Sequence, residues 1–204
     1  MMQIDASLYR EIQDYAENHR VPIINFEGAS LLVQTISSSK PLSILEIGTA
    51  IGYSTLKFIE HMSSNARLVS IELDPERVMI AKSFIAKAGA EDRVQIIAGD
   101  AGSILPQLTG PFDMVFIDAA KGQYLDYLKK VEDKLSQHSV VIADNVLFRG
   151  YVESNEAPPR RYKTIVKRLR EYLNYVTDHP NFNTHLHRVG DGVAISYYRG
   201  KTSE

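Results

Sequence analysis

The sequence predicts an α/β fold with a mostly parallel, seven-stranded sheet, a C-terminal antiparallel hairpin and helices on both faces. From residue 43 onward, short apolar runs alternate with longer stretches of 3.6-residue periodicity, which indicates βα units. The alternation ends in two strand-like runs joined by Gly190-Asp191-Gly192, a hairpin signal. The 204 residues and an apolar fraction of 44% suit one buried core. We therefore expect a single domain over residues 1–204.

The individual elements are expected in the following order. Residues 1–40 form a helical segment packed on the domain, with helices over 6–20 and 28–37. The parallel strands are expected over 43–47, 67–72, 94–98, 112–117 and 139–143. The helices between and after them are expected near 53–62, 75–88, 101–107, 122–134 and 160–176. The hairpin strands are expected over 183–189 and 193–198.

Composition excludes several classes of protein and site. The formal net charge is −2, so affinity for nucleic acid or a membrane surface would have to come from a local patch. The chain has no cysteine, which excludes disulfides and thiolate metal ligands and leaves oxygen and histidine ligands. The first residues, Met1 to Asp5, lack a signal-peptide pattern, and no apolar run approaches the ~20 residues that span a bilayer. We expect a cytoplasmic protein with no membrane partner.

A glycine-containing turn follows the first expected strand. It reads E-x-G-x-x-x-G from Glu46 through Gly48 to Gly52, and glycines at such a turn let the backbone pass close to a ligand. Glu46 stands where a dinucleotide-binding fingerprint has its first glycine. A carboxylate there suits a cationic amino-acid tail better than a pyrophosphate. Alone, the pattern is equally typical of a tight strand-to-helix turn.

The next two expected strands also end in acidic residues. Glu72 lies about 20 positions after the glycines, where an acidic side chain can accept hydrogen bonds from ribose hydroxyls. The third strand ends in Gly99-Asp100-Ala101, where the chain would pass an adenine ring. Either acid alone could simply cap a helix. The three strand ends together predict a nucleoside-type cofactor site.

The fourth and fifth expected strands end in Asp118 and in Asp144-Asn145. Because ligands of open α/β sheets bind at the carboxyl ends of the strands, these side chains should face one crevice. Three hard oxygen ligands are a typical protein share for Mg²⁺, although a strand-end Asp is also often a helix cap. Lys121 follows Asp118 by one short turn and is a candidate base, with a solvated surface lysine as the alternative.

These segments resemble the metal-dependent O-methyltransferases of the catechol and caffeoyl-CoA type, which have a Rossmann-like class I methyltransferase fold. The quoted motifs lie in 45–54, 116–124 and 144–150, and the likeness extends from about Val21 to Arg199. It implies S-adenosylmethionine as cofactor, a homodimer, Lys121 and Asp118 as catalytic residues, and a divalent metal held by Asp118, Asp144 and Asn145. With the strand-end analysis it predicts cofactor contacts from Ile23, Ile24, Glu46, Gly48, Ser54, Glu72, Asp100, Ala101 and Asp118.

Within the family, the segments 144–150 and 189–196 are most similar to the bacterial branch that methylates 5-hydroxyuridine at the tRNA wobble position. This implies the tRNA anticodon loop as partner, and the neighbouring C5 hydroxyl and C4 carbonyl oxygens of 5-hydroxyuridine could chelate Mg²⁺ as a catechol does. Cations at helical spacing in 160–170 could follow phosphates, although a solvated face is the ordinary interpretation. The candidate substrate contacts are Arg149, Arg160, Lys163, Lys167 and Arg170.

Three other functions are weighed against this one. A small catechol or a caffeoyl-CoA-like ester could be the acceptor, with the segment 148–159 forming its pocket. A non-catalytic RNA-binding or cofactor-sensing module is disfavoured because Asp118, Lys121, Asp144 and Asn145 are all present. A nicotinamide oxidoreductase is disfavoured by Glu46 and by the terminal hairpin.

Overall fold

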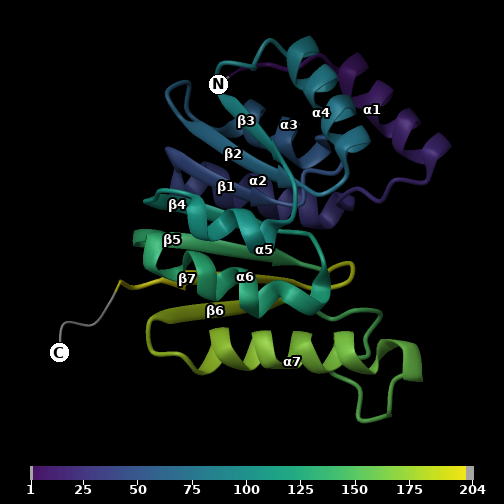
Figure 1. Cartoon of the computed structure of the whole chain (residues 1–204), viewed down its shortest axis with the longest axis vertical. Helices are drawn as coiled ribbons and strands as arrows, with labels where there is room; N and C mark the ends of the chain where they lie inside the picture. Colours follow the sequence, from purple (N-terminus) through teal and green to yellow (C-terminus); the bar gives the residue numbers. More distant parts are fainter. Residues whose placement is uncertain (1, 201–204) are drawn as a thin grey trace.

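The computed structural model describes residues 2–200 and contains one seven-stranded sheet in the order β3-β2-β1-β4-β5-β7-β6 (Figure 1). Strands β1 to β5 pair in parallel, whereas β7 runs antiparallel between β5 and β6. The strands are β1 (Ser43–Ile47), β2 (Arg67–Glu72), β3 (Val94–Ala98), β4 (Phe112–Ile117), β5 (Leu135–Asp144), β6 (Phe182–His187) and β7 (Val193–Tyr198). The predicted mostly parallel sheet with its antiparallel hairpin is confirmed.

Helices cover both faces of the sheet, as predicted (Figure 1). One face packs against α1 (Ala6–His19), α2 (Phe26–Ser39), α3 (Tyr53–His61) and α4 (Pro75–Lys87). The other packs against α5 (Ala101–Ile104), α6 (Tyr124–Val131) and α7 (Lys163–Asp178). Short 3-10 turns flank these helices: η1 (Leu105–Gln107), η2 (Lys121–Gln123), η3 (Glu132–Lys134) and η4 (Arg160–Tyr162).

Alternation along the central strands supplies both cores. In β4, Phe116 packs edge-on against Phe58 of α3, whereas its neighbour Ile117 enters the core on the opposite face. Both faces are therefore buried, and the central strands are nearly continuous apolar runs. Polar residues at the strand ends are consequently conspicuous in the sequence.

Three boundaries differ from the sequence-based expectation. Strand β5 begins at Leu135 and not at Ser139, because a register shift opposite β4 and a left-handed His138 (φ 67°) interrupt its alternation. Strand β6 ends at His187, so the hairpin connection spans residues 188–192. The expected helix over 160–176 begins instead as η4 and becomes α-helical only at Lys163.

The sheet reverses its direction of strand addition between β1 and β4, which are hydrogen-bonded neighbours. Gly48, just after β1, has φ +103°, and a Cβ there would lie 2.1 Å from the carbonyl oxygen of Asp118. Only glycine lets these two strand ends approach so closely. Such a reversal point is where open α/β sheets bind ligands at the carboxyl ends of their strands. Among residues 2–200, no helix is long and apolar enough to cross a bilayer.

Candidate active site

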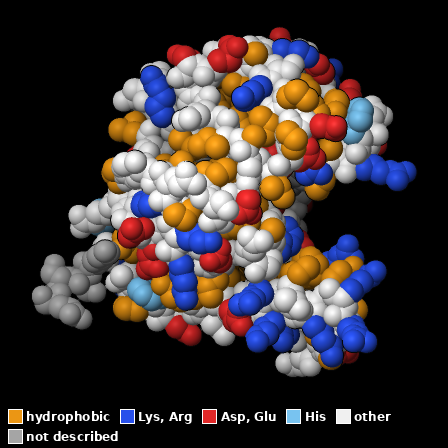
Figure 2. All heavy atoms as spheres, in the orientation of Figure 1, with side chains coloured by type: hydrophobic (Ala, Val, Ile, Leu, Met, Phe, Trp, Pro, Cys, Tyr) orange, Lys and Arg blue, Asp and Glu red, His pale blue; other side chains and the backbone are white. Residues whose placement is uncertain are grey.

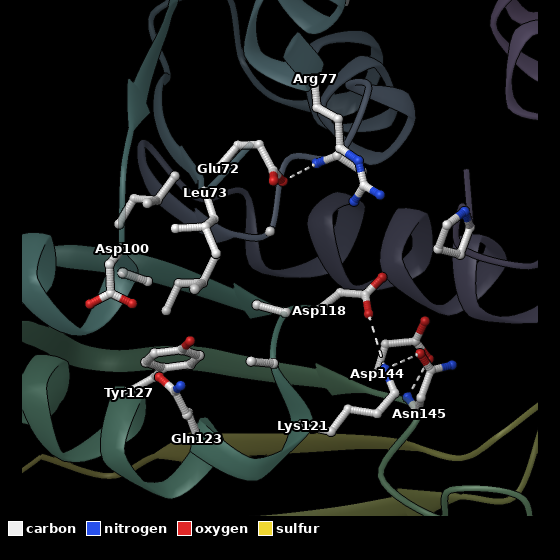
Figure 3. A pocket seen from close by; sticks show the side chains of 18 of the residues that line it. Glu72, Leu73, Arg77, Asp100, Asp118, Lys121, Gln123, Tyr127, Asp144 and Asn145 are labelled. Carbon is white, nitrogen blue, oxygen red and sulfur yellow. Dashed lines mark hydrogen bonds and ion pairs between the residues drawn. The ribbon is translucent and has the colours of Figure 1, made fainter. Parts of the chain in front are cut away.

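A pocket of about 390 Å³ opens at the carboxyl ends of the parallel strands. In Figure 2 the surface is hollowed at the right-hand edge, where these strand ends lie in Figure 1. In Figure 3, Glu72 and Asp100 lie toward one end of the pocket, and the side chains of Asp118, Asp144 and Lys121 gather at the other. The predicted residues that line it are Ile23, Gly48, Glu72, Asp100, Ala101, Asp118, Lys121, Asp144 and Asn145.

Three predicted cofactor residues, Ile24, Glu46 and Ser54, do not line this pocket. The Glu46 carboxylate is fully buried behind the turn and accepts hydrogen bonds from the hydroxyls of Ser54 (2.6 Å), Thr55 (2.6 Å) and Ser70 (2.7 Å). Burial raises the pKa of Glu46, and the three hydroxyl donors oppose that shift. Its visible role is to tie α3 and β2 to β1, and its contact with a cofactor stays a prediction.

Glu72 is placed where the sequence predicts a ribose-binding acid. Its two carboxylate oxygens accept backbone hydrogen bonds from Ala50 (2.8 Å) and Asp74 (2.9 Å). These bonds fix the side chain, which lines the pocket and has lone pairs left for ligand hydroxyls. Asp74, and not Glu72, caps α4, so the helix-cap alternative for Glu72 is wrong.

Asp100 caps α5 by accepting hydrogen bonds from the backbone nitrogen and the hydroxyl of Ser103 (both 3.0 Å). It also lines the pocket, so the capping and ligand-binding interpretations are compatible. Tyr127 lies near it in Figure 3, and burial raises the pKa of Tyr127 to about 12. Sequence reasoning missed Tyr127 as a pocket residue because it shares the apolar stripe of α6 with Tyr124, Leu128 and Val131.

Asp144 is the most strongly perturbed acid of the acidic end. Only 2% of its surface is exposed, and Oδ1 accepts a hydrogen bond from the Asn145 nitrogen at 2.7 Å. The second oxygen, Oδ2, is buried and has no hydrogen-bond partner among the described residues. Burial and the nearby charge of Asp118 raise the pKa of Asp144 to about 6. A buried carboxylate oxygen without a partner is costly unless a cation or a donor satisfies it.

Lys121 lies beside the same oxygens. Its Nζ donates a hydrogen bond to Asn145 Oδ1 (2.8 Å) and lies 3.7 Å from Asp118 Oδ1. Burial raises the pKa of Asp118, and the charge of Lys121 acts in the opposite direction. Within residues 2–200 no three acidic, histidine or cysteine side chains gather as a metal site. Two carboxylates and one amide oxygen do gather here, and these hard donors fit a divalent cation of the Mg²⁺ type.

The hairpin turn 188–192 holds the segment that carries Asn145. Asn145 has a left-handed backbone (φ 54°), and the nitrogens of Val146 and Leu147 donate to the carbonyls of Gly192 (3.0 Å) and Asp191 (2.9 Å). The Asp191 carboxylate also accepts from the Arg149 nitrogen. Sequence reasoning recognised Gly190-Asp191-Gly192 only as a turn, and the sequence carries no separate signal for its contact with the ligand segment.

The predicted substrate contacts fall into two groups. Arg149, Arg160 and Lys163 are exposed, and Figure 2 shows Lys and Arg side chains gathered around the N-terminal end of α7, next to the hollow. Arg170 is different, since its guanidinium donates to the carbonyls of Tyr151 (3.0 Å), Val152 (2.8 Å) and Ser154 (2.8 Å). The expectation that Arg170 follows phosphates is therefore wrong, because its donors hold residues 151–154. Lys167 lies 3.8 Å from Glu171, which partly neutralises it.

Comparisons with known proteins agree with this architecture. The family model described as O-methyltransferase matches residues 8–198. A catechol O-methyltransferase of Niastella koreensis is 40% identical over 122 residues, 57% of this chain and 55% of that protein. A catechol O-methyltransferase of Mycobacterium tuberculosis is 31% identical over 196 residues, 91% of this chain and 84% of that protein.

A solved relative has the same fold and contains a cofactor. The O-methyltransferase TomG of Streptomyces achromogenes, solved in complex with S-adenosylmethionine, superposes with a TM-score of 0.85 at 27% identity. The superposition covers 98% of this chain and 92% of TomG. The predicted class of fold and the predicted family are thereby confirmed. The chain belongs to the S-adenosylmethionine-dependent O-methyltransferase family.

Proposed function

We propose that this protein transfers a methyl group from S-adenosylmethionine to a hydroxyl that has a second oxygen beside it, and that its acceptor is 5-hydroxyuridine in a tRNA anticodon loop. The product would be 5-methoxyuridine. The observation that carries the proposal is the unpartnered oxygen of Asp144 beside Asp118 and Asn145, at one end of the pocket. Such a donor set is suited to a cation that two adjacent acceptor oxygens can chelate.

The cofactor would occupy the end of the pocket that contains Glu72 and Asp100. S-adenosylmethionine supplies an electrophilic methyl group on a positively charged sulfur. Glu72 would accept hydrogen bonds from the ribose hydroxyls, as its fixed carboxylate and position at the end of β2 suggest. Ala101 and Tyr127 supply apolar contacts for the adenine ring. The acidic residues also favour a cationic cofactor over a pyrophosphate.

The acceptor would lie at the other end of the pocket. Asp118, Asp144 and Asn145 would hold a divalent cation, which, when bound, favours the ionised form of an acceptor hydroxyl. Lys121 Nζ lies within reach of the same oxygens, and its neutral amine would take the hydroxyl proton. Asp118 holds Lys121 on this side of the pocket. The protein thus orients the acceptor and removes its proton.

The tRNA acceptor rests on the resemblance of 144–150 and 189–196 and on the exposed cations beside the pocket. A small catechol is the second candidate, because the curated relatives above are named catechol O-methyltransferases. A homodimer and a cytoplasmic location stay predictions. The complete set of Asp118, Lys121, Asp144 and Asn145 argues against a non-catalytic module.

One experiment decides between the acceptors. The purified protein is incubated with methyl-labelled S-adenosylmethionine and Mg²⁺, and with tRNA carrying 5-hydroxyuridine, the same tRNA carrying uridine, or catechol. Mass spectrometry of the nucleosides and of the catechol product measures methylation. We expect 5-methoxyuridine only from the first tRNA, and none with the Asp144→Asn variant. Rapid methylation of catechol with no methylation of either tRNA would assign the protein to the second candidate.

A further inference from the structure

The cations around the N-terminal end of α7 differ in whether the protein neutralises them. Arg168 lies 3.1 Å from Glu171, and Arg188 lies 2.7 Å from Glu153. The donors of Arg170 are used by backbone carbonyls. Most of the basic side chains of this region are therefore already paired inside the molecule.

Four other cations form what we call the free basic cluster: Arg149, Arg160, Arg161 and Lys163. All four are exposed, and within residues 2–200 none of them has an acidic side chain within ion-pair distance. The three of them that lie in sequence, 160–163, flank Tyr162. Four like charges gathered without a counter-ion repel one another, and an anion placed among them would remove that repulsion.

Tyr162 organises the cluster. The Arg149 guanidinium donates to the Tyr162 hydroxyl at 3.1 Å, and the Arg161 guanidinium lies 4.6 Å from the centre of the Tyr162 ring. The ring is held in turn by Phe148 and Tyr151, whose ring centres lie 5.2 Å and 5.8 Å away. Two guanidiniums are thus held on one aromatic support, which reduces the side-chain entropy lost when they bind an anion.

The cluster is attached directly to the acceptor end of the pocket. Arg149 follows the proposed metal ligand Asn145 by four positions, and its backbone nitrogen is fixed by Asp191. Phe148 and Arg149 both have left-handed backbones, with φ of 42° and 58°. Non-glycine residues keep such conformations only where the surrounding structure imposes them, and they concentrate at functional sites.

We propose that the free basic cluster binds the phosphodiester backbone of the RNA next to the nucleotide that is methylated. This inference rests on the proposed tRNA acceptor and replaces the helical stripe with a different set of residues. Arginine pairs suit phosphate because each guanidinium can donate two parallel hydrogen bonds to it. The contacts would be independent of base sequence and would set the position of the loop, while the pocket selects the nucleotide.

The test measures RNA binding, so that its result does not depend on turnover. The probe is an anticodon stem-loop RNA that carries unmodified uridine, titrated onto the full-length protein across a series of salt concentrations. The variants are Arg160→Ala with Arg161→Ala, and Lys163→Ala; Arg168→Ala, on the same helix but paired with Glu171, is the matched control. Thermal unfolding of each variant verifies that it is folded.

We expect the double variant to flatten the logarithmic salt dependence by about two and Lys163→Ala by about one, with Arg168→Ala close to the wild type. Each lost contact should reduce the change in affinity roughly three- to fourfold over a fourfold range of salt. Unchanged slopes in the cluster variants, or equal losses in Arg168→Ala, would overturn the inference. Weaker binding of coenzyme A with unchanged RNA binding would assign the cluster to an ester substrate and also overturn it. Wild-type protein that binds RNA through the cluster but does not methylate 5-hydroxyuridine would contradict the proposed function alone.

Discussion

Lys121 Nζ donates a 2.8 Å hydrogen bond to Asn145 Oδ1, so the candidate base and a candidate metal ligand share one oxygen. The same ammonium lies 3.7 Å from Asp118 Oδ1. A divalent cation bound to Asp118 and Asn145 would compete with Lys121 for these oxygens and repel its positive charge. The arrangement therefore links cation binding to the displacement and the deprotonation of Lys121.

The Lys121→Met variant tests this link. Removal of the ammonium removes a positive charge from the donor set, so Mg²⁺ should bind at least as tightly as to the wild type. Loss of the base should lower the rate of methyl transfer about 10²- to 10⁴-fold. Calorimetry with Mg²⁺ and single-turnover methylation measure the two quantities. Weaker Mg²⁺ binding together with an unchanged rate would show that Lys121 is a structural residue.

Asp144→Asn tests the buried acid in the metal-free protein. Because folding raises the pKa of Asp144 from 3.8 to about 6, the folded chain holds the proton more tightly than the unfolded chain. The free energy of unfolding of the wild type therefore falls as the pH rises through this window. Asn keeps the acceptor for the Asn145 nitrogen and carries no charge. At neutral pH the variant should be more stable by about 1–3 kcal/mol, with no difference at acidic pH.

Chemical denaturation in the presence of a chelator, repeated across the pH range, measures this difference. Thr35→Ser, a conservative change in α2 away from the acidic end, is a control that should leave the pH dependence unchanged. A variant that is no more stable than the wild type at neutral pH would mean that Asp144 is not strained by its burial.

Asp191 is expected to position the ligand segment and not to touch the substrate. Asp191→Ala removes the acceptor for the Arg149 nitrogen, whereas Asp191→Asn retains an oxygen there. Loss of such a supporting contact typically lowers metal affinity about 10- to 100-fold. We expect that loss for the Ala variant, with little change for the Asn variant and unchanged S-adenosylmethionine binding. Equal metal affinities in all three proteins would exclude the positioning role.

Arg170→Ala should weaken the fold and not only the binding of a substrate. Three carbonyl acceptors at Tyr151, Val152 and Ser154 lose their common donor. The free energy of unfolding should fall by about 1–3 kcal/mol, as is usual when hydrogen bonds to a charged group are removed. Arg168→Ala, an exposed neighbour, should stay within about 0.5 kcal/mol of the wild type. Denaturation curves that coincide for both variants would refute the structural role of Arg170.

Much of the fold and the acidic end of the site could be predicted because they depend on local patterns. Buried parallel strands are apolar runs, and Asp118 and Asp144 stand out because each follows such a run directly. The glycines near Gly48 mark the close approach of two strand ends, which is also a backbone requirement.

The remainder depends on contacts between distant segments, which no local pattern records. Glu46 is buried behind the turn because hydroxyls of α3 and β2 reach it, and Arg170 is used by carbonyls from the segment before α7. Helical spacing alone could not distinguish Arg170 from the free cations Arg160 and Lys163. The role of Asp191 likewise appears only when β7 pairs with β5.

The most direct test of the central claim is whether methyl transfer requires a divalent cation at the acidic end of the pocket. Wild-type protein is treated with EDTA, dialysed and assayed for methyl transfer to 5-hydroxyuridine tRNA and to catechol, with and without added Mg²⁺. The account predicts that activity on the true acceptor disappears with EDTA and returns with Mg²⁺, while S-adenosylmethionine still binds in calorimetry. Full activity in the presence of EDTA would contradict it.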